Sequence, residues 1–145
     1  MAQMRTEEAR ENLSDIAVAM DRSLRVFADF VKPILRRHKA TDLSFGNLMF
    51  LISVGEGDAR VKDLVQKGRH VGSNASYALK ALEKGGYIKR WMDESDRRNA
   101  LVSWTPKAID VVTDIKTAAS PARPSGLDLR KAFAAFESHC ARVPE

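Results

Sequence analysis

The stretch from Val71 to Arg90, VGSNASYALKALEKGGYIKR, constrains the fold of this chain more than any other. Its apolar residues recur at steps of three and four, which predicts a helix that buries one face: Ala75, Ala78, Leu79 and Leu82. The pair of glycines that follows stops this helix, and the next residues, YIKRWM, read as a strand.

The elements expected on either side complete a recognisable unit. A short helix is predicted at about 61–67, with Gly68 as its C-cap, and RHVG makes the turn into the next helix. A second strand, ALVSW, follows the polar loop DESDRRN, which is too long for a tight two-residue hairpin. Two short helices followed by a β-hairpin form the winged helix-turn-helix arrangement.

A long amphipathic helix is predicted ahead of this unit, from about Thr6 to His38. Pro33 lies inside it and is expected to kink the helix or to end its regular part. A helix of this length exceeds what a small domain can cover, so part of its apolar stripe is expected to meet another chain. The alternative is a helix that lies across its own core.

Three further helices complete the predicted order. Ser44 can cap a helix at 45–54, and Thr105 can cap another that has Pro106 at its first position. In that second helix the residues expected to point inward are Ile109, Val112 and Ile115. The prolines and glycine of AASPARPSG then break the chain, and a last amphipathic helix is expected at about 127–141, with Leu129, Phe133 and Phe136 as its apolar residues.

The predicted fold is mainly α with a small β-hairpin wing. The 145 residues have the length of one domain. Within the single domain 1–145 we expect an N-terminal dimerisation helix (1–40), a winged helix-turn-helix lobe (41–105) and C-terminal helices that contribute to dimerisation (106–145). Trp104 falls on an inward strand position and is expected in the core, whereas the place of Trp91 stays open.

The positive charge of the chain is concentrated in one segment. From Arg60 to Arg98 there are ten basic and five acidic residues, and this excess equals the net charge of +5 of the whole chain. The rest of the sequence is therefore neutral. Positive charge gathered in one module is typical of a protein that binds a polyanion, and here it favours nucleic acid.

The residue types at the start of the 71–84 helix suit a DNA groove. The second helix of a winged helix-turn-helix unit enters the major groove with its N-terminal end toward the bases. Small and polar residues there let the backbone approach, and lysines farther along can reach phosphates. The candidate contacts are Ser73, Asn74, Ser76, Tyr77, Lys80 and Lys84. Ser73 is equally well explained as an N-cap, and Tyr77 could instead pack on the turn.

The loop between the two strands supplies the second group of candidates. A narrow minor groove attracts arginine, and a hairpin tip that carries Arg97 and Arg98 could deliver one. The carboxylate of Asp96 could hold the guanidinium in place. The alternative is a surface turn with a local ion pair.

Other kinds of chemistry find little support in the sequence. His38, His70 and His139 are too scattered for a metal site, and a single cysteine supplies no CxxC pair. No P-loop, GxSxG or GxGxxG pattern occurs. We therefore expect no enzyme, no metal and no cofactor, and Cys140 is expected to be an ordinary helix residue.

The sequence also predicts where the protein works. No apolar run approaches the roughly 20 residues of a membrane span, and the charged N-terminus does not resemble a signal peptide. A lone cysteine suits a reducing compartment. We expect a cytoplasmic protein with no membrane partner.

The stretch LVQKGRHVGSNASYALKALEKGGYIKRWMDESDRRNALVSWTPKA resembles the MarR family of winged helix-turn-helix transcription regulators. The helix start GSNASY is similar to one branch of the family, and the Asp-Arg-Arg wing and the Thr-Pro start of the next helix also match. The resemblance implies a homodimer that reads a pseudo-palindromic promoter site, usually as a repressor. It also implies that Arg98 enters the minor groove, that Asp96 orients it, and that a small aromatic or anionic effector can bind.

Three positions depart from the family pattern. Arg60 stands where members often have Ser or Thr as a helix cap, and Ala108 replaces a common glycine. The break at AASPARPSG shortens the long helix of typical members, which puts the usual effector pocket in doubt.

The function predicted from the sequence is that of a dimeric, sequence-specific DNA-binding transcription regulator, with repression favoured over activation. Two alternatives stay open. One is a winged-helix adaptor or anti-repressor without DNA binding of its own, and the other is a small-molecule sensor whose DNA affinity is secondary.

Overall fold

The computed structural model describes residues 12–70, 72–120 and 128–141, and its chain forms two units. One unit, here called the central lobe, comprises Ala28–Ala119. The other joins the N-terminal residues up to Phe27 with the residues from Ser120 onward.

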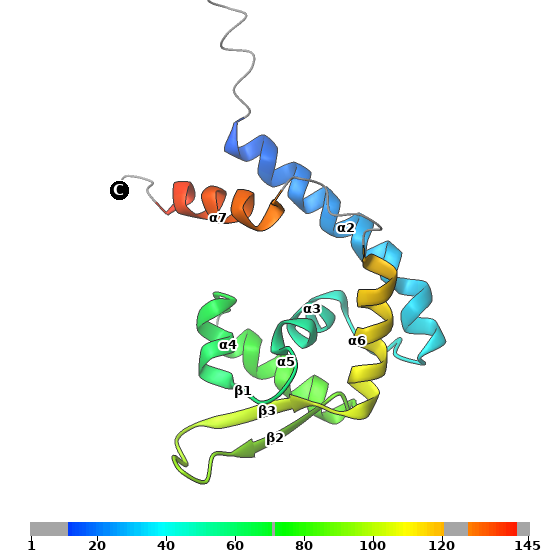
Figure 1. Cartoon of the computed structure of the whole chain (residues 1–145), viewed down its shortest axis with the longest axis vertical. Coiled ribbons are helices and arrows are strands. Elements are labelled where there is room, and N and C mark those ends of the chain that lie inside the picture. The colour runs from blue at the N-terminus through cyan, green and yellow to red at the C-terminus, as the bar shows by residue number, and fades with distance from the viewer. Residues whose placement is uncertain (1–11, 71, 121–127, 142–145) are drawn as a thin grey trace, which may run out of the picture. The chain divides into compact units, whose positions relative to one another are not determined.

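The order of elements follows the predicted one, with a short additional strand (Figure 1). The elements are α2 (Leu13–Arg37), α3 (Phe45–Val54), β1 (Ala59–Arg60), α4 (Val61–Lys67), α5 (Gly72–Lys84), β2 (Ile88–Met92), β3 (Ala100–Trp104), α6 (Pro106–Ala119) and α7 (Leu129–Cys140). The predicted helices at 45–54 and 61–67 and the strand at 100–104 have the expected bounds. The structure is mainly α-helical with one small antiparallel sheet, which confirms the predicted fold class.

A three-stranded antiparallel sheet lies in the central lobe, in the order β1-β3-β2. Strand β3 is central: Val102 pairs with Ala59 of β1 and with Arg90 of β2. The sequence did not predict β1, because two residues are too few to show an alternating pattern.

The core of the central lobe gathers where the helices meet one face of the sheet. Trp104 ties β3 to α3, since its indole Nε1 donates a hydrogen bond of 2.7 Å to the carbonyl of Leu51. The largest fully buried side chains come from every helix of the lobe except α4, from β3 and from the turn between α5 and β2: Val31, Leu48, Leu51, Leu79, Leu82, Tyr87, Val102, Val111, Val112 and Ile115. Strand pairing and helix packing therefore hold α5 and the hairpin in one body.

Helix boundaries agree with their predicted caps. The Ser44 hydroxyl accepts a hydrogen bond of 3.1 Å from the amide of Asn47, and Gly68 follows α4 as its C-cap. Arg60 occupies the N-cap position of α4 and makes no side-chain capping bond, as its departure from the Ser/Thr pattern implies.

Helix α2 continues through Pro33 to Arg37, within the range 6–38 predicted for it, so the proline does not end the helix. One expectation about a helix was wrong. Val112 and Ile115 are buried as predicted, but Ile109 is 46% exposed, and Ala108 and Val111 are buried in addition. The buried stripe of α6 is thus shifted by one residue at its start.

A polar cluster joins the end of α2 to α6 within the central lobe. Asp114 accepts a hydrogen bond of 3.2 Å from Arg37 and lies 2.8 Å from His38 Nε2. These two contacts, the one to His38 first, hold the pKa of the Asp114 carboxyl below its usual value. The carboxylate is therefore charged at neutral pH.

The second unit contains the first half of α2 and the helix α7. No residue of α7 is buried, and Leu129 and Phe133 are exposed. The predicted break at 118–126 and the start of the predicted helix at 127–141 fall largely on residues 121–127, outside the described residues. None of the helices that the structure describes is long and apolar enough to cross a bilayer.

Candidate nucleic-acid interface

Helix α5 has two distinct faces. Ala75, Ala78, Leu79 and Leu82 are buried, as the sequence predicted. Every residue proposed to contact DNA from this helix is exposed: Ser73, Asn74, Ser76, Tyr77, Lys80 and Lys84. The buried face fixes the helix on the lobe and leaves the polar face toward solvent.

The residue types on the exposed face of α5 change from the start of the helix to its end. Ser73, Tyr77, Lys80 and Lys84 follow one another at steps of four, three and four, so they form one stripe. The side chain of Tyr77 is not packed on the preceding turn, because 74% of the residue is exposed. Small and polar groups thus occupy the first turns, and the ammonium groups occupy the later ones.

The start of α5 differs in one detail from the prediction. The helix begins at Gly72, so Ser73 lies in its first turn rather than at the N-cap. No acidic residue occurs in this first turn. The amides at a helix start favour an anion, and here no neighbouring carboxylate in the turn opposes one.

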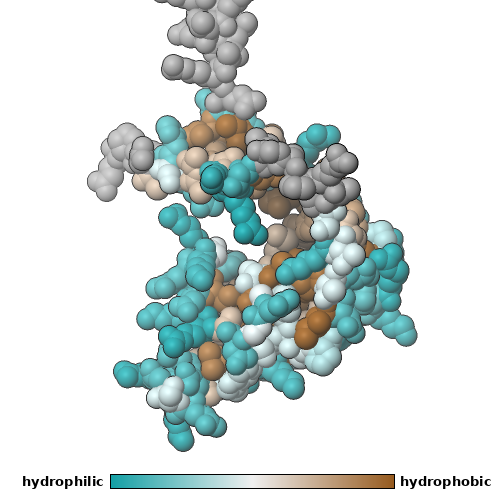
Figure 2. Space-filling view, viewed as in Figure 1, coloured by the Kyte–Doolittle hydropathy of each residue, from teal (hydrophilic) through white to brown (hydrophobic). Residues whose placement is uncertain are grey.

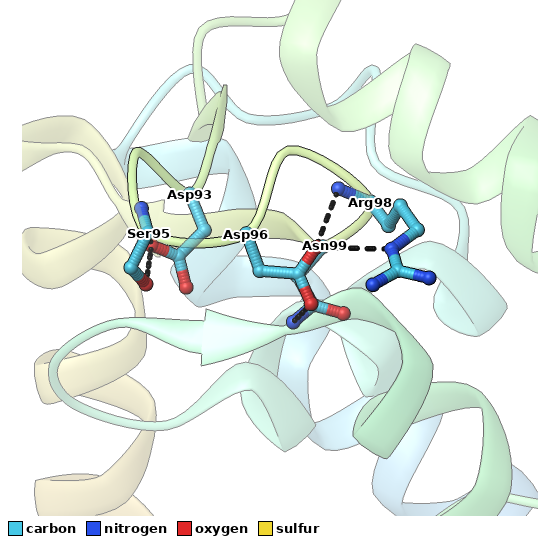
Figure 3. A network of polar contacts seen from close by, with 5 residues as sticks. All are labelled: Asp93, Ser95, Asp96, Arg98 and Asn99. Carbon is cyan, nitrogen blue, oxygen red and sulfur yellow. Dashed lines mark hydrogen bonds and ion pairs between the residues drawn. The ribbon is translucent and has the colours of Figure 1, made fainter.

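The loop between β2 and β3 is ordered by its own carboxylates (Figure 3). Asp96 Oδ1 accepts hydrogen bonds from the amide of Arg98 (3.1 Å) and from its Nε (3.3 Å), and Asp96 Oδ2 accepts one from Asn99 (3.4 Å). The expected contact between Asp96 and Arg98 is therefore present. Since only Nε of the guanidinium is engaged, its two terminal nitrogens point away from the acid and remain available.

A second turn of the same loop carries Asp93. The hydroxyl and the amide of Ser95 donate to its carboxylate at 2.7 and 3.0 Å, and they hold the pKa of Asp93 below its usual value. The two arginines of the loop, Arg97 and Arg98, are both exposed.

The surface over α4 and the hairpin is mostly hydrophilic in the view of Figure 2.

The C-terminal end of α5 is held by contacts between residues far apart in the sequence, here called the Tyr87 joint: Asp42, Tyr87, Thr105 and Lys107. Tyr87 is 1% exposed, and its hydroxyl donates a hydrogen bond of 2.5 Å to Asp42. Lys107 lies 4.4 Å from the centroid of the Tyr87 ring and donates to the carbonyl of Gly85, while the Thr105 hydroxyl donates to the carbonyl of Gly86. The end of α5 is thus attached both to the segment before α3 and to the start of α6.

These contacts of Tyr87 were not predicted from the sequence. Asp42 and Lys107 lie 45 and 20 residues from Tyr87 along the chain, and nothing in a local pattern connects them. The only available signal was an aromatic residue directly after a Gly-Gly stop, which indicates a side chain that turns back on the helix end.

Alkaline pH should expose the contribution of Tyr87 to stability. Burial, and then the hydrogen bond and charge of Asp42, raise the pKa of Tyr87 well above its usual value of 10.0. The folded protein therefore retains the phenolic proton to a higher pH than the unfolded chain does. The resulting stabilisation is complete below pH 10 and is lost as the pH rises above it.

We expect the free energy of unfolding, measured by urea denaturation between pH 7 and 11, to fall above pH 10 and to fall less steeply in Tyr87→Phe. At neutral pH the same substitution should cost about 1.5–3 kcal/mol, because it removes a hydrogen bond to a charged group. The only other tyrosine, the exposed Tyr77, supplies the control: Tyr77→Phe should keep the alkaline slope of the parent. An equal slope in Tyr87→Phe would contradict this account.

The part of the chain that the structure describes contains no group of three or more His, Cys, Asp or Glu side chains placed to hold a metal ion. Cys140 is exposed at the end of α7.

Comparison with known proteins agrees with this geometry. Residues 48–108 match the family model described as "winged helix DNA-binding domain", and they include α4, α5 and the whole sheet. The exopolysaccharide II synthesis transcriptional activator ExpG of Rhizobium meliloti is 31% identical over 105 residues, which cover 72% of this chain. The chain spans about half of that relative, since the match covers 54% of its length.

Solved structures share the fold at low sequence identity. FabT of Streptococcus pneumoniae, in complex with DNA, is 18% identical with a TM-score of 0.60, and the match covers 92% of this chain and 85% of FabT. A MarR transcriptional regulator from Methanosarcina mazei is 20% identical with a TM-score of 0.63, covering 87% and 94% of the two chains. Residues 48–108 therefore match a winged helix domain, and the chain has the fold of MarR transcriptional regulators.

Proposed function

We propose that this protein is a sequence-specific DNA-binding transcription regulator that acts as a homodimer on a pseudo-palindromic promoter site. The observation that carries the proposal is the exposed polar face of α5 beside a wing whose Arg98 is held by Asp96. DNA-bound relatives of the same fold, such as FabT, support it. Its place of action would be the cytoplasm.

The side chains of α5 would divide the work of recognition. Asn74 can donate and accept at a base edge, Ser76 can bond either kind of edge, and Tyr77 offers an apolar ring with a hydroxyl. Lys80, Lys84 and the helix start at Ser73 would contact phosphates. These contacts would read the major groove.

The wing would serve the neighbouring minor groove. Arg98 has the terminal nitrogens of its guanidinium available, and the narrow groove of A/T-rich DNA has the negative potential that attracts it. Asp96 would orient this side chain, and Arg97 would add charge near the backbone.

Dimerisation is supported by apolar side chains that the described residues leave uncovered. On α2, Val18 and Val26 are 69% and 59% exposed, and on α7 Leu129 and Phe133 are also exposed. Monomeric proteins rarely leave such a series uncovered, so a second copy is the partner we propose.

Val18→Glu combined with Val26→Glu should shift the protein from dimer to monomer in sedimentation equilibrium, because both changes place a charge in the proposed interface. The affinity for a duplex with two half-sites should fall as the dimer is lost. Thr41→Glu, at an exposed position outside α2, tests the effect of an added charge alone. A parent protein that sediments as a monomer at the concentrations at which it binds its operator would contradict the homodimer.

Arg98→Ala should weaken binding to the selected operator about 10- to 100-fold, since it removes a charge-assisted contact from each protomer. It should also lower the slope of log affinity against log salt by about two per dimer, and reduce the preference for A/T-rich flanks. Fluorescence anisotropy with labelled duplexes at several salt concentrations measures all three effects.

The matched control for this substitution is Arg36→Ala, which removes another exposed arginine, at the far end of α2. It should leave the operator affinity and the salt slope close to those of the parent. Parental behaviour of Arg98→Ala would exclude the proposed role of the wing.

Repression is the sign of regulation that the proposed mode of binding favours, because an occupied promoter excludes polymerase. Activation is the second candidate, since the relative from Rhizobium meliloti is named an activator. A promoter reporter compared with and without the protein separates the two. A small aromatic or anionic effector stays part of the proposal.

A further inference from the structure

A hollow of about 250 Å³ lies in the central lobe, away from the exposed face of α5. It is bordered by the turn after α3, the end of β3 and the first half of α6, which Figure 1 shows close to one another. Its lining consists of Glu56, Gly57, Ser103, Trp104, Ile109 and Thr113. We refer to it as the Trp104 hollow.

The apolar part of this hollow is formed by Trp104 and Ile109, neither of which is fully buried. Ile109 is 46% exposed, although its position at the start of α6 predicted a core residue. The indole of Trp104 is half-buried, and its N–H is already bonded to the carbonyl of Leu51. A ligand would therefore meet the face or edge of the indole ring and the aliphatic side chain of Ile109, with no donor from the indole.

The polar part of the hollow includes one negatively charged side chain, that of Glu56. Glu56 is the single charged residue of the lining, and its carboxylate makes no hydrogen bond or ion pair with the described residues. The other polar side chains are the hydroxyls of Ser103 and Thr113. A carboxylate, two hydroxyls and an aromatic ring together form an environment that favours a cation.

The chain itself places a cation over the indole ring of Trp104. The ammonium group of Lys116 lies 5.4 Å from the centroid of the Trp104 ring. Ile109, Thr113 and Lys116 follow at steps of four and three on α6, so they share one side of that helix.

We propose that the Trp104 hollow binds a small organic cation: a primary ammonium group on a short aromatic or aliphatic body. The ammonium would pair with Glu56 and donate to Ser103 or Thr113, and the body would lie against Trp104 and Ile109. A cavity of about 150 Å³ holds benzene, so 250 Å³ accommodates an aromatic ring with a two-carbon ammonium arm. This site does not depend on DNA binding, and its charge is opposite to that suited to an anionic effector.

The test uses the full chain, 2-phenylethylammonium as the probe and phenylacetate as an anion of similar size. Two-dimensional NMR distinguishes the indole N–H signals of the two tryptophans, so it locates the probe. We expect saturable shifts of the Trp104 signal with the ammonium probe, little change at Trp91, and much weaker binding of phenylacetate.

Glu56→Gln should weaken the ammonium probe about tenfold or more, because the charge-assisted contact is lost while the shape is kept. Glu83→Gln removes an exposed carboxylate of α5 outside the hollow and should bind as the parent does. Glu56 is exposed, so its replacement should leave the fold intact.

Several results would overturn the proposal. They are absence of saturable binding, equal affinity in Glu56→Gln, and affinity for phenylacetate as high as for the ammonium probe. A Trp104 signal that shifts with protein concentration in the absence of any probe would show that a second copy of the chain covers the hollow, and would overturn it as well.

Discussion

Asn74→Ala should remove most of the sequence discrimination of this protein while leaving its non-specific affinity for DNA nearly unchanged. An amide side chain can bond a base edge with a donor and an acceptor at once, and each such contact contributes about 1–3 kcal/mol of discrimination. A dimer would lose the contact in both half-sites, so the ratio of specific to non-specific affinity should fall by roughly the square of the effect at one site.

The measurement needs a site chosen by the protein itself, for example by genomic footprinting followed by selection from a random duplex library. Competition between that site, single-base variants and non-specific duplex then gives the specificity ratio. Tyr77→Ala should behave like Asn74→Ala, because 74% of Tyr77 is exposed on the same part of α5.

Lys84→Ala is the matched control on the same helix. It removes an exposed charge at the last turn of α5, so it should weaken all duplexes about equally and keep the specificity ratio. If Asn74→Ala and Tyr77→Ala both retain the parental ratio, α5 does not read bases in the proposed way.

Much of this interface could be predicted because its signals are local. The buried face of α5 follows from the spacing of Ala75, Ala78, Leu79 and Leu82, and the outward position of the polar residues is the necessary complement. The contact between Asp96 and Arg98 spans two residues, so it too depends only on the loop. Local periodicity and loop chemistry thus determine most of the candidate site.

The features that were missed depend on partners far along the chain. Ile109 belongs to the apolar pattern of α6, but the turn after α3 and the end of β3 leave a hollow where it lies. Helix α2 does run past Pro33, as its predicted range implied, and the burial of Val31, Ile34 and Leu35 in its last turns stabilises it there. Tertiary packing can offset the cost of a proline, and a single sequence does not reveal how much packing is available.

Gly85→Ala should destabilise the protein, by about 2–4 kcal/mol, because a methyl group at this position has no room. A Cβ on Gly85 would lie 2.7 Å from Cε2 of Tyr87, 2.8 Å from its Cδ2 and 3.0 Å from Oδ2 of Asp42. The Tyr87 ring is buried and cannot move aside without shifting its neighbours. The expected cost combines overpacking of about 1–3 kcal/mol with weakening of the hydrogen bond to Asp42.

Gly46→Ala provides the matched control, since it makes the same change inside α3 where a Cβ would meet nothing within 4 Å. It should raise the free energy of unfolding by about 0.5–1 kcal/mol, because alanine is the better helix former. Urea denaturation at pH 7 measures both variants. Parental stability of Gly85→Ala would show that the ring yields easily.

A double-mutant cycle decides whether the loss in Gly85→Ala acts through the tyrosine. If the added methyl group displaces the Tyr87 ring and breaks its bond to Asp42, then Tyr87→Phe should cost less in the Gly85→Ala background than in the parent. Because the same joint attaches α5 to the start of α6 through Lys107 and Thr105, DNA affinity measured well below the melting temperature should fall in parallel. Additive costs would instead mean that the methyl group is accommodated elsewhere and that the joint between Tyr87 and Asp42 survives.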